Sequence, residues 1–219
     1  MERHDLRSRR IPETTIRRLP AYLRALTLIG QDRITSEALG QLSGYSSEQV
    51  RKDLAYFGAF GTRGVGYDAQ LLAQEIRRIL QLDHGVRAVV VGAGRLGTAL
   101  VRHTGETSGD VVIAGVVDID PAVIGRQVDH LRVEPLDALE SIIRERNIGM
   151  GIITVPPQGA QAVCDRLVQA GVKAILNFAP RALVVNNPEV FVQQIDLTLE
   201  MQALAYFVGS TERTSHPKN

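Results

Sequence analysis

The sequence predicts an α/β protein with a small, mainly helical N-terminal module and a larger domain built on a parallel sheet. Helical periods fill residues 11–82, whereas apolar runs alternate with helical periods from residue 87 onward. The charge also changes sign, because residues 1–66 hold 11 basic and 7 acidic side chains and residues 67–219 hold 14 and 17. A basic module joined to a mildly acidic domain favours a polyanion as the partner of the first part.

The first predicted helix covers residues 11–29. Pro12 suits its first turn, where a helix needs no backbone N–H, whereas Pro20 should bend the helix or interrupt it. The apolar stripe of this helix, at spacings of three and four, consists of Ile16, Leu19, Leu23 and Leu26.

Two shorter helices are expected next, in the arrangement of a helix-turn-helix. One starts at a cap formed by Thr35 or Ser36, and the other starts at Ser46, with Gln49 in the capping-box position. Their buried sides are predicted to be Ala38, Leu39 and Leu42 in the former and Val50, Leu54 and Phe57 in the latter. The opposite face of the latter helix carries Ser47, Arg51 and Lys52.

A glycine-rich segment over residues 58–67 predicts a β-hairpin with Arg63 near its tip. A helix over residues 69–82 then leads to a domain boundary at residues 83–85. These elements form a winged helix-turn-helix, in which Arg51 and Lys52 would reach guanine edges or phosphates in the major groove. Arg63 would fit the narrow minor groove beside it. The alternative is a solvated charged face next to an ordinary hairpin.

The second domain is predicted to have a Rossmann-like fold. Its strands are expected at residues 87–91, 111–117, 149–155 and 174–176, and its helices at residues 96–103, 136–146 and 158–170. Strands that alternate with helices require a parallel sheet with helices on both faces. A last helix over residues 197–207 has an apolar face that the little remaining chain cannot cover.

The strongest functional signal is GAGRLG at residues 92–97, between a predicted strand and a predicted helix. Gly92 permits a tight turn, Gly94 lets the backbone approach a pyrophosphate, and Gly97 lets the helix pack closely on the strand. Asp118, about 20 residues further on, would accept hydrogen bonds from the adenosine ribose and repel a 2′-phosphate. The motif therefore predicts NAD(H) rather than NADP(H), the alternative being a mere turn.

Other candidate residues carry weaker signals. Thr154, Val155, Pro156 and Asn177 end later strands on the rim where such sheets bind ligands, although turn chemistry explains each equally well. The five histidines show no metal-ligand spacing, so no metal site is expected. The single cysteine, Cys164, is expected in the core.

Composition and domain arrangement limit the function further. One cysteine and a charged N-terminus favour the cytoplasm, and no segment approaches the roughly 18 apolar residues of a membrane span. A nicotinamide dehydrogenase needs a substrate domain, and the 219 residues leave no room for one. A cofactor bound without a catalytic partner is better explained as a signal, which favours a transcription factor that reads NAD(H) over an enzyme.

The chain resembles the Rex family, the redox-sensing transcriptional repressors of bacteria. The resemblance covers roughly residues 10–209 and rests on five motifs in family order. They are SSEQVRKDLAYFGAFGTRGVGY at residues 46–67, VVGAGRLGTAL at 90–100, VVDIDPAVIGRQV at 116–128, ITVPPQGAQAV at 153–163 and ILNFAP at 175–180.

The resemblance implies a homodimer that binds an inverted-repeat operator when NADH is scarce and is released by NADH. NAD+ competes with NADH and favours DNA binding. It implies a winged-helix domain at residues 1–84, a Rossmann domain at 85–194 and a C-terminal helix and tail at 195–219, the helix being swapped between subunits. The residues assigned to DNA are Ser47, Gln49, Arg51, Lys52, Tyr56 and Arg63. The residues assigned to the cofactor are Gly92, Ala93, Gly94, Arg95, Leu96, Gly97, Asp118, Thr154, Val155, Pro156 and Asn177.

A polar cluster that links the domains is also implied by the resemblance, at Arg24, His103 and Asp196. The family usually has a tyrosine at the position of His103. Three alternatives remain at this point: an enzyme related to the CoA-binding domains of acyl-CoA ligases, a plain NAD-dependent reductase, and a regulator that reads another nucleotide.

Overall fold

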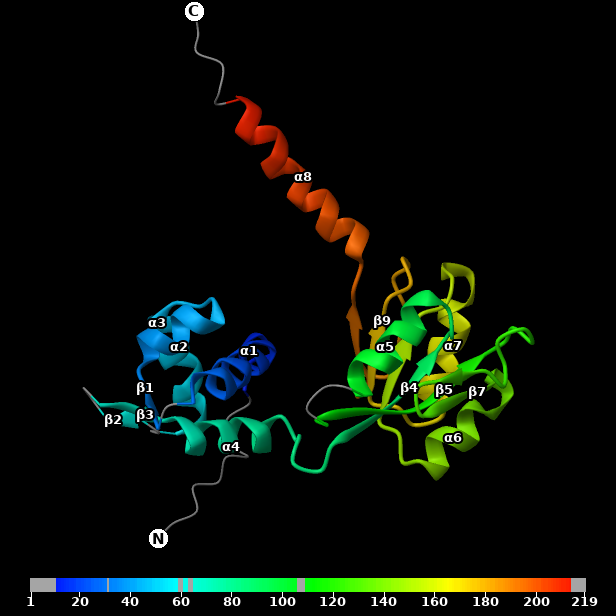
Figure 1. Ribbon diagram of the computed structural model, residues 1–219, viewed down its shortest axis with the longest axis horizontal. Coiled ribbons are helices and arrows are strands. Elements are labelled where there is room, and N and C mark those ends of the chain that lie inside the picture. Colours follow the sequence, from blue (N-terminus) through cyan, green and yellow to red (C-terminus); the bar gives the residue numbers. More distant parts are fainter. Residues whose placement is uncertain (1–10, 31, 59–60, 63–64, 106–108, 214–219) are drawn as a thin grey trace, which may run out of the picture. The chain divides into compact units, whose positions relative to one another are not determined.

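The computed structural model describes residues 11–30, 32–58, 61–62, 65–105 and 109–213 (Figure 1). The chain divides into two compact units, residues 1–84 and residues 85–219. We call them the N-terminal unit and the C-terminal unit, and each is described by itself.

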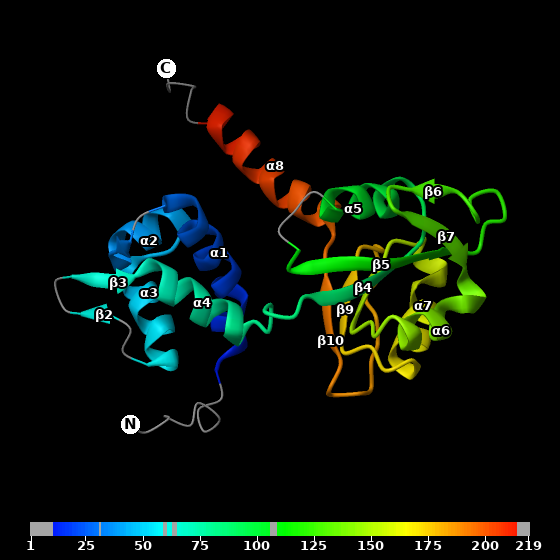
Figure 2. The same cartoon turned by 60° about the horizontal axis from the view of Figure 1, so that its bottom comes forward.

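The N-terminal unit is a winged helix-turn-helix (Figure 2). Its elements are α1 (Glu13–Ile29), β1 (Arg33–Ile34), α2 (Ser36–Ser43), α3 (Ser47–Leu54), the 3-10 turn η2 (Ala55–Phe57), β2 (Gly61–Thr62), β3 (Gly66–Asp68) and α4 (Ala69–Ile79). The three short strands pair antiparallel in the order β1-β3-β2, so β2 and β3 form the predicted hairpin.

Side-chain caps fix where the two helices of the helix-turn-helix begin. Thr35 accepts a hydrogen bond from the backbone N–H of Ala38, and Ser46 accepts one from that of Gln49. These bonds satisfy backbone donors that the first turn of a helix leaves unpaired. Of the two caps proposed for α2, Thr35 is therefore the right one.

Three details differ from the sequence-based expectation. The helix α1 continues through Pro20 without a break, because Pro20 lies on the exposed side and the opposite face is held by buried Leu19, Tyr22 and Leu23. Leu42, expected in the core, is 53% exposed. The helix α4 ends at Ile79, three residues earlier than predicted.

The C-terminal unit is a Rossmann-like domain with a seven-stranded sheet. Its elements are β4 (Val86–Val91), α5 (Arg95–Gly105), β5 (Val111–Asp118), β6 (Gln127–Val128), β7 (Leu131–Pro135), η3 (Leu136–Ala138), α6 (Leu139–Glu145), β8 (Met150–Ile153), α7 (Pro157–Gln169), β9 (Ala174–Asn177), β10 (Phe191–Gln194) and α8 (Leu197–Arg213). The strand order is β10-β9-β8-β4-β5-β7-β6, and every pair is parallel except β6 with β7.

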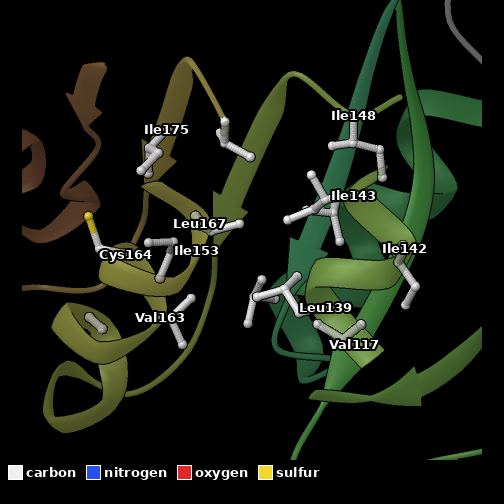
Figure 3. Packing of buried hydrophobic residues seen from close by; sticks show 14 of the residues in the cluster. Val117, Leu139, Ile142, Ile143, Ile148, Ile153, Val163, Cys164, Leu167 and Ile175 are labelled. Carbon is white, nitrogen blue, oxygen red and sulfur yellow. The ribbon is translucent and has the colours of Figure 1, made fainter. Parts of the chain in front are cut away.

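A dry apolar layer fixes the sheet to the helices α6 and α7 (Figure 3). Ile143 of α6 and Leu167 of α7 are almost fully buried against the sheet residues Ile153 and Ile175. Cys164 belongs to this layer and is fully buried, as expected for a small core residue. Burial raises the pKa of its thiol, which disfavours the reactive thiolate.

A side-chain cap marks the start of the last helix, α8. Asp196 accepts hydrogen bonds from the backbone N–H groups of Thr198 and Leu199, which makes it the cap of α8. The helix exposes a series of large apolar side chains: Leu197, Leu199, Met201, Leu204, Tyr206, Phe207 and Val208. Among the described helices, none is long and apolar enough to span a bilayer.

Candidate functional site

The glycine turn after β4 sits where the strand order of the sheet reverses. From β4 the chain proceeds to β5 and β7 on one side, and then crosses to β8 on the other side. Such a reversal opens a crevice at the carboxyl ends of the strands, which is where parallel sheets of this kind bind ligands. Gly92 follows β4 and Thr154 follows β8, so both lie at this crevice.

Each glycine of GAGRLG has a different environment. Gly92 has a φ of +105°, and a Cβ there would lie 2.9 Å from the carbonyl group of Thr154. A Cβ on Gly97 would lie only 1.9 Å from the carbonyl oxygen of Gly92. In contrast, apart from Gly94 itself and its two neighbours in the chain, no described residue has an atom within 4 Å of the place that a Cβ on Gly94 would take. Gly92 and Gly97 therefore shape the turn, and Gly94 leaves open space above it.

Thr154 fixes the turn from the neighbouring strand. Its hydroxyl donates to the carbonyl oxygens of Gly92 at 2.8 Å and Val91 at 3.0 Å, and its backbone N–H donates to Val91 as well. The hydroxyl group of Thr154 is thus hydrogen-bonded to the backbone of the turn. Thr154 positions the glycine turn, in addition to lining the cavity described next.

A cavity of about 740 Å³ opens beside the turn, within the range of small-molecule sites. Its lining consists of Val91, Gly92, Gly94, Asp118, Ile119, Leu136, Thr154, Val155, Pro156, Gln158, Gly159, Ala162, Val163 and Arg166. Six of the sequence-predicted cofactor residues are among them: Gly92, Gly94, Asp118, Thr154, Val155 and Pro156.

Asp118 presents its carboxylate at the edge of this cavity. One carboxylate oxygen accepts the backbone N–H of Ala93 at 2.5 Å, and the other accepts that of Asp120 at 2.9 Å. A carboxylate has about four lone-pair sites, so each oxygen keeps capacity for one more donor. The carboxylate is therefore fixed in place and still able to accept two hydroxyl groups.

Arg166 is a cavity residue that the sequence reasoning missed. Its guanidinium donates twice to Glu140, at 2.6 and 2.7 Å, and once to the carbonyl oxygen of Leu136 at 3.0 Å. The hydrogen bonds hold the pKa of Glu140 below its ordinary value. This pair connects α6 with α7 and fixes the wall of the cavity at Leu136.

A smaller cavity of about 360 Å³ also borders the glycine motif. Ala93, Gly94 and Arg95 line it from the turn, and Arg102 and Arg126 add two further guanidinium groups. Leu96 is 38% exposed, whereas Gly97 is buried in the packing of the turn.

Asn177 lies outside both linings. It is fully buried, and its amide nitrogen donates to the backbone carbonyl oxygen of Arg181 at 2.9 Å and to the side-chain amide oxygen of Gln194 at 2.6 Å. Its amide oxygen accepts the backbone N–H of Ala179. The structure therefore places Asn177 at the end of β9, where its polar atoms organise the backbone of the loop that leads to β10.

The predicted DNA-binding residues share the helix α3 and the turn after it. Arg51 and Lys52 are exposed, and Ser47 and Tyr56 are half-buried. Arg51 donates to the hydroxyl of Ser36, at the start of α2, at 2.9 Å. Arg63 lies outside the described residues.

A buried carboxylate beneath this surface was also missed by the sequence reasoning. Asp53, 1% exposed, accepts two hydrogen bonds from the guanidinium of Arg18, at 2.6 and 2.8 Å. Tyr22 donates at 2.8 Å, Thr15 at 3.0 Å, and the side-chain amide of Gln49 at 2.9 Å. Burial alone would raise the pKa of Asp53, but these donors outweigh it and hold the pKa below its ordinary value.

This network predicts acid sensitivity of the N-terminal unit. The lowered pKa means that ionised Asp53 stabilises the fold, fully above the unfolded-state pKa of about 3.9 and progressively less as the pH falls through the folded-state value. We expect the difference in Tm between the wild type and Asp53→Asn to be largest near neutral pH and to shrink below about pH 4. Circular dichroism melts of both proteins from pH 3 to 7 measure it, and a constant difference would contradict the prediction.

The three residues assigned to the interdomain cluster lie in different units. Arg24 is exposed on α1 of the N-terminal unit. His103 is exposed on α5, and Asp196 caps α8, both in the C-terminal unit. Across the part of the chain that the structure describes, no group of three or more His, Cys, Asp or Glu side chains is placed to hold a metal ion.

Comparison with protein families assigns a known type to each unit. Residues 83–181 match the family model described as a CoA binding domain, and residues 10–55 match the model described as a putative DNA-binding protein N-terminus. The first match covers the crevice and both cavities. The second covers α1 to α3.

Curated relatives extend the similarity to nearly the whole chain. The chain is 46% identical, over 91% of its length and 80% of the relative, to the redox-sensing transcriptional repressor Rex of Streptomyces griseus. It is 42% identical to the Rex repressor of Syntrophomonas wolfei, over 93% of the chain and 98% of the relative.

Solved structures agree with these relatives. The fold is similar to that of RSP, a Rex-family repressor, in complex with NAD+ and operator DNA, with a TM-score of 0.85, 32% identity and coverage of 94% and 96% of the two chains. The structure of RSP in complex with NADH matches with a TM-score of 0.81 and 30% identity, over 94% of this chain and 98% of that one.

Proposed function

The chain belongs to the Rex family of redox-sensing transcriptional repressors, and from this premise we propose which of its residues meet the dinucleotide and the operator. Its function is to repress transcription by binding operator DNA when the NADH/NAD+ ratio is low, and to be released by NADH. It is accordingly a regulator and not an enzyme. The observation that carries the proposal is the glycine turn with fixed Asp118 in one unit and the exposed face of α3 in the other.

The residues of the crevice fit NAD(H). Open space above Gly94 suits a pyrophosphate that approaches the N-terminus of α5, where backbone N–H groups are unpaired. The two remaining acceptor sites of Asp118 suit the two hydroxyl groups of a ribose, and its charge opposes a 2′-phosphate. When bound, the dinucleotide supplies the signal, because its nicotinamide ring carries a positive charge only in the oxidised form.

The exposed face of α3 fits the major groove. Arg51 and Lys52 supply the charge that phosphates and guanine edges attract, and Ser47 lies at the start of the same helix. A recognition helix commonly reads bases with residues of its N-terminal part. Arg63 is proposed to reach the minor groove from the tip of the hairpin.

A homodimer accounts for the apolar face of α8. Its seven large apolar side chains are each 58% exposed or more in a single chain, and monomeric soluble proteins rarely expose so many neighbouring apolar side chains. Exchange of α8 between two copies would cover this face. A dimer also matches an inverted repeat, because two recognition helices must enter major grooves about 34–36 Å apart.

This spacing explains how a cofactor controls DNA binding. A modest rotation between two subunits removes one recognition helix from its groove, so the cofactor needs only to favour one arrangement. To shift such an equilibrium from 1:99 to 99:1 requires about 5.5 kcal/mol of differential affinity. NAD+ and NADH differ by one full charge on the nicotinamide ring, and in a partly buried site this difference is large enough to supply that differential affinity. We assign the coupling between units to Arg24, His103 and Asp196.

The decisive experiment is fluorescence anisotropy on a labelled inverted-repeat duplex at fixed salt, titrated separately with NADH, NAD+ and NADPH. We expect release by NADH alone. DNA binding that is indifferent to all three would show that the crevice reads another ligand, and no DNA binding at all would overturn the proposal.

Substitution of the recognition helix tests the DNA assignment. Arg51→Ala should weaken operator binding by about 1–3 kcal/mol, because it removes a contact to a base or phosphate, and should leave NADH affinity unchanged. Arg78→Ala on α4 removes an equal charge from an exposed arginine that pairs with Glu75. Anisotropy should show a much smaller loss for Arg78→Ala; equal losses would contradict a specific role of Arg51.

A further inference from the structure

A buried network of polar side chains joins the helix α3 to α1, beside the apolar core that the two helices share. The backbone of α1 lies close to α2 and α4 (Figure 2), and the polar contacts of α1 with α3 are made by side chains. Asp53 supplies the acceptor on α3, and Thr15, Arg18 and Tyr22 supply donors from three successive turns of α1. This carboxylate therefore adds directional hydrogen bonds to the apolar packing that holds α3 on α1.

The same carboxylate holds a side chain that the sequence assigns to DNA. Gln49 lies one turn before Asp53 on α3, and its amide nitrogen donates to one carboxylate oxygen at 2.9 Å. That oxygen also accepts from Thr15 and Arg18, so five hydrogen bonds in all use the lone pairs of the carboxylate. Gln49 itself is half-buried. A glutamine amide reads a base edge only when its oxygen and nitrogen point in a defined direction.

We propose that Asp53 is a positioning residue for operator recognition: its carboxylate fixes α3 on α1 and orients the amide of Gln49, and thereby determines the base preference of the helix. Asp53 is buried and does not touch DNA itself. The inference rests on the proposed function of α3 as the recognition helix. It adds an interior residue to the determinants of sequence preference.

Asp53→Asn is the main variant, because an asparagine keeps the shape and loses the charge. Its NH₂ group must face donors from Arg18 or Gln49, so the network loses at least one acceptor. Glu48→Gln is the matched control, since Glu48 is an exposed acid on the same helix. Removal of a negative charge near DNA favours binding in both variants by electrostatics alone. Positioning predicts the opposite sign for Asp53→Asn.

The experiment measures operator affinity by anisotropy on the full-length protein, with a panel of duplexes that each change one base pair of the half-site. We expect Asp53→Asn to bind the operator about tenfold more weakly and Glu48→Gln to bind it equally or more tightly. We also expect Asp53→Asn to alter the preference at one base pair, and Gln49→Ala to alter it at the same base pair. A loss caused only by partial unfolding would weaken all duplexes by the same factor.

Each outcome decides the proposal. An unchanged base preference in a folded Asp53→Asn protein, or in Gln49→Ala, overturns it. If Asp53→Asn does not fold, Gln49→Ala and the milder Thr15→Val, which removes one donor to Asp53, take its place with the same expected shift in preference. Failure of the wild type to bind any operator would instead overturn the proposed function, and calorimetry of NADH binding checks that the C-terminal unit is intact.

Discussion

Replacement of Gly97 by alanine is expected to destabilise the C-terminal unit, whereas replacement of Gly94 by alanine is expected to leave it folded and to remove most of its NADH affinity. A Cβ on Gly97 would lie 1.9 Å from a backbone oxygen of the same turn, which cannot give way as a flexible side chain does. Overpacking of this kind costs about 3 kcal/mol. In a domain of this size, such a loss lowers Tm by roughly 10 °C.

Gly94 differs because its Cβ meets open space in the protein. The unit should therefore unfold at the wild-type temperature. The added methyl group would occupy the approach of the pyrophosphate and weaken one or two charge-assisted hydrogen bonds, at about 1.5–3 kcal/mol each. NADH affinity should fall by about a hundredfold.

Circular dichroism melts and calorimetric titration with NADH separate the two effects. Gly149→Ala is a suitable control, because no described atom lies within 4 Å of its Cβ and it lies outside both cavity linings. It should change neither quantity. Wild-type stability of Gly97→Ala would contradict the tight turn, and wild-type NADH affinity of Gly94→Ala would contradict the assignment of the open space to the dinucleotide.

Periodicity predicted the long elements of the fold, and it failed on the short ones. The strand β7 reads LRVEP and alternates over only four residues before a proline, and β10 reads FVQQ and has neither an apolar run of strand length nor an alternation. Each extends the sheet by pairing parallel with a neighbouring strand, β10 with β9 and β7 with β5, which a pattern within the segment itself does not reveal. Pro20 shows the same dependence on tertiary context, because burial of one face of α1 keeps the helix continuous.

The candidate site shows a similar division. Residues with a backbone role in a known motif, such as Gly92 and Gly97, could be placed from spacing alone. Polar residues such as Asn177 and Asp53 could not, because their role depends on partners distant in sequence. Asn177 ends a strand at the expected rim but turns inward to Gln194. A signal for Asp53 was nevertheless present, because helical spacing places it on the same face as Val50 and Leu54.

Removal of the Asp118 carboxylate is expected to cause the largest loss of NADH affinity without loss of DNA binding. The side chain has two tasks in the structure: it accepts the N–H of Ala93, which fixes the turn, and it keeps two acceptor sites for a ribose. Asp118→Ala removes both. Loss of two hydrogen bonds to a charged group, at about 1.5–3 kcal/mol each, predicts a loss of NADH affinity of a hundredfold or more.

The charge of Asp118 can be separated from its shape. Asp118→Asn keeps an oxygen that can accept from Ala93 and removes the repulsion of a 2′-phosphate, so the ratio of NADPH to NADH affinity should rise. Asp120→Asn is the control, because Asp120 is an exposed acid two residues away whose side chain accepts only a local backbone N–H in the described structure. Its NADH affinity should match the wild type.

The effect on repression distinguishes a sensor residue from a structural one. Asp118 lies in the C-terminal unit, and the proposed DNA contacts lie on α3 of the N-terminal unit. Asp118→Ala should therefore bind operator as the wild type does in the absence of NADH, and should require a much higher NADH concentration for release. Anisotropy with and without NADH measures both quantities. Loss of operator binding without any cofactor would show that Asp118 supports the fold, and unchanged NADH affinity would remove it from the dinucleotide site.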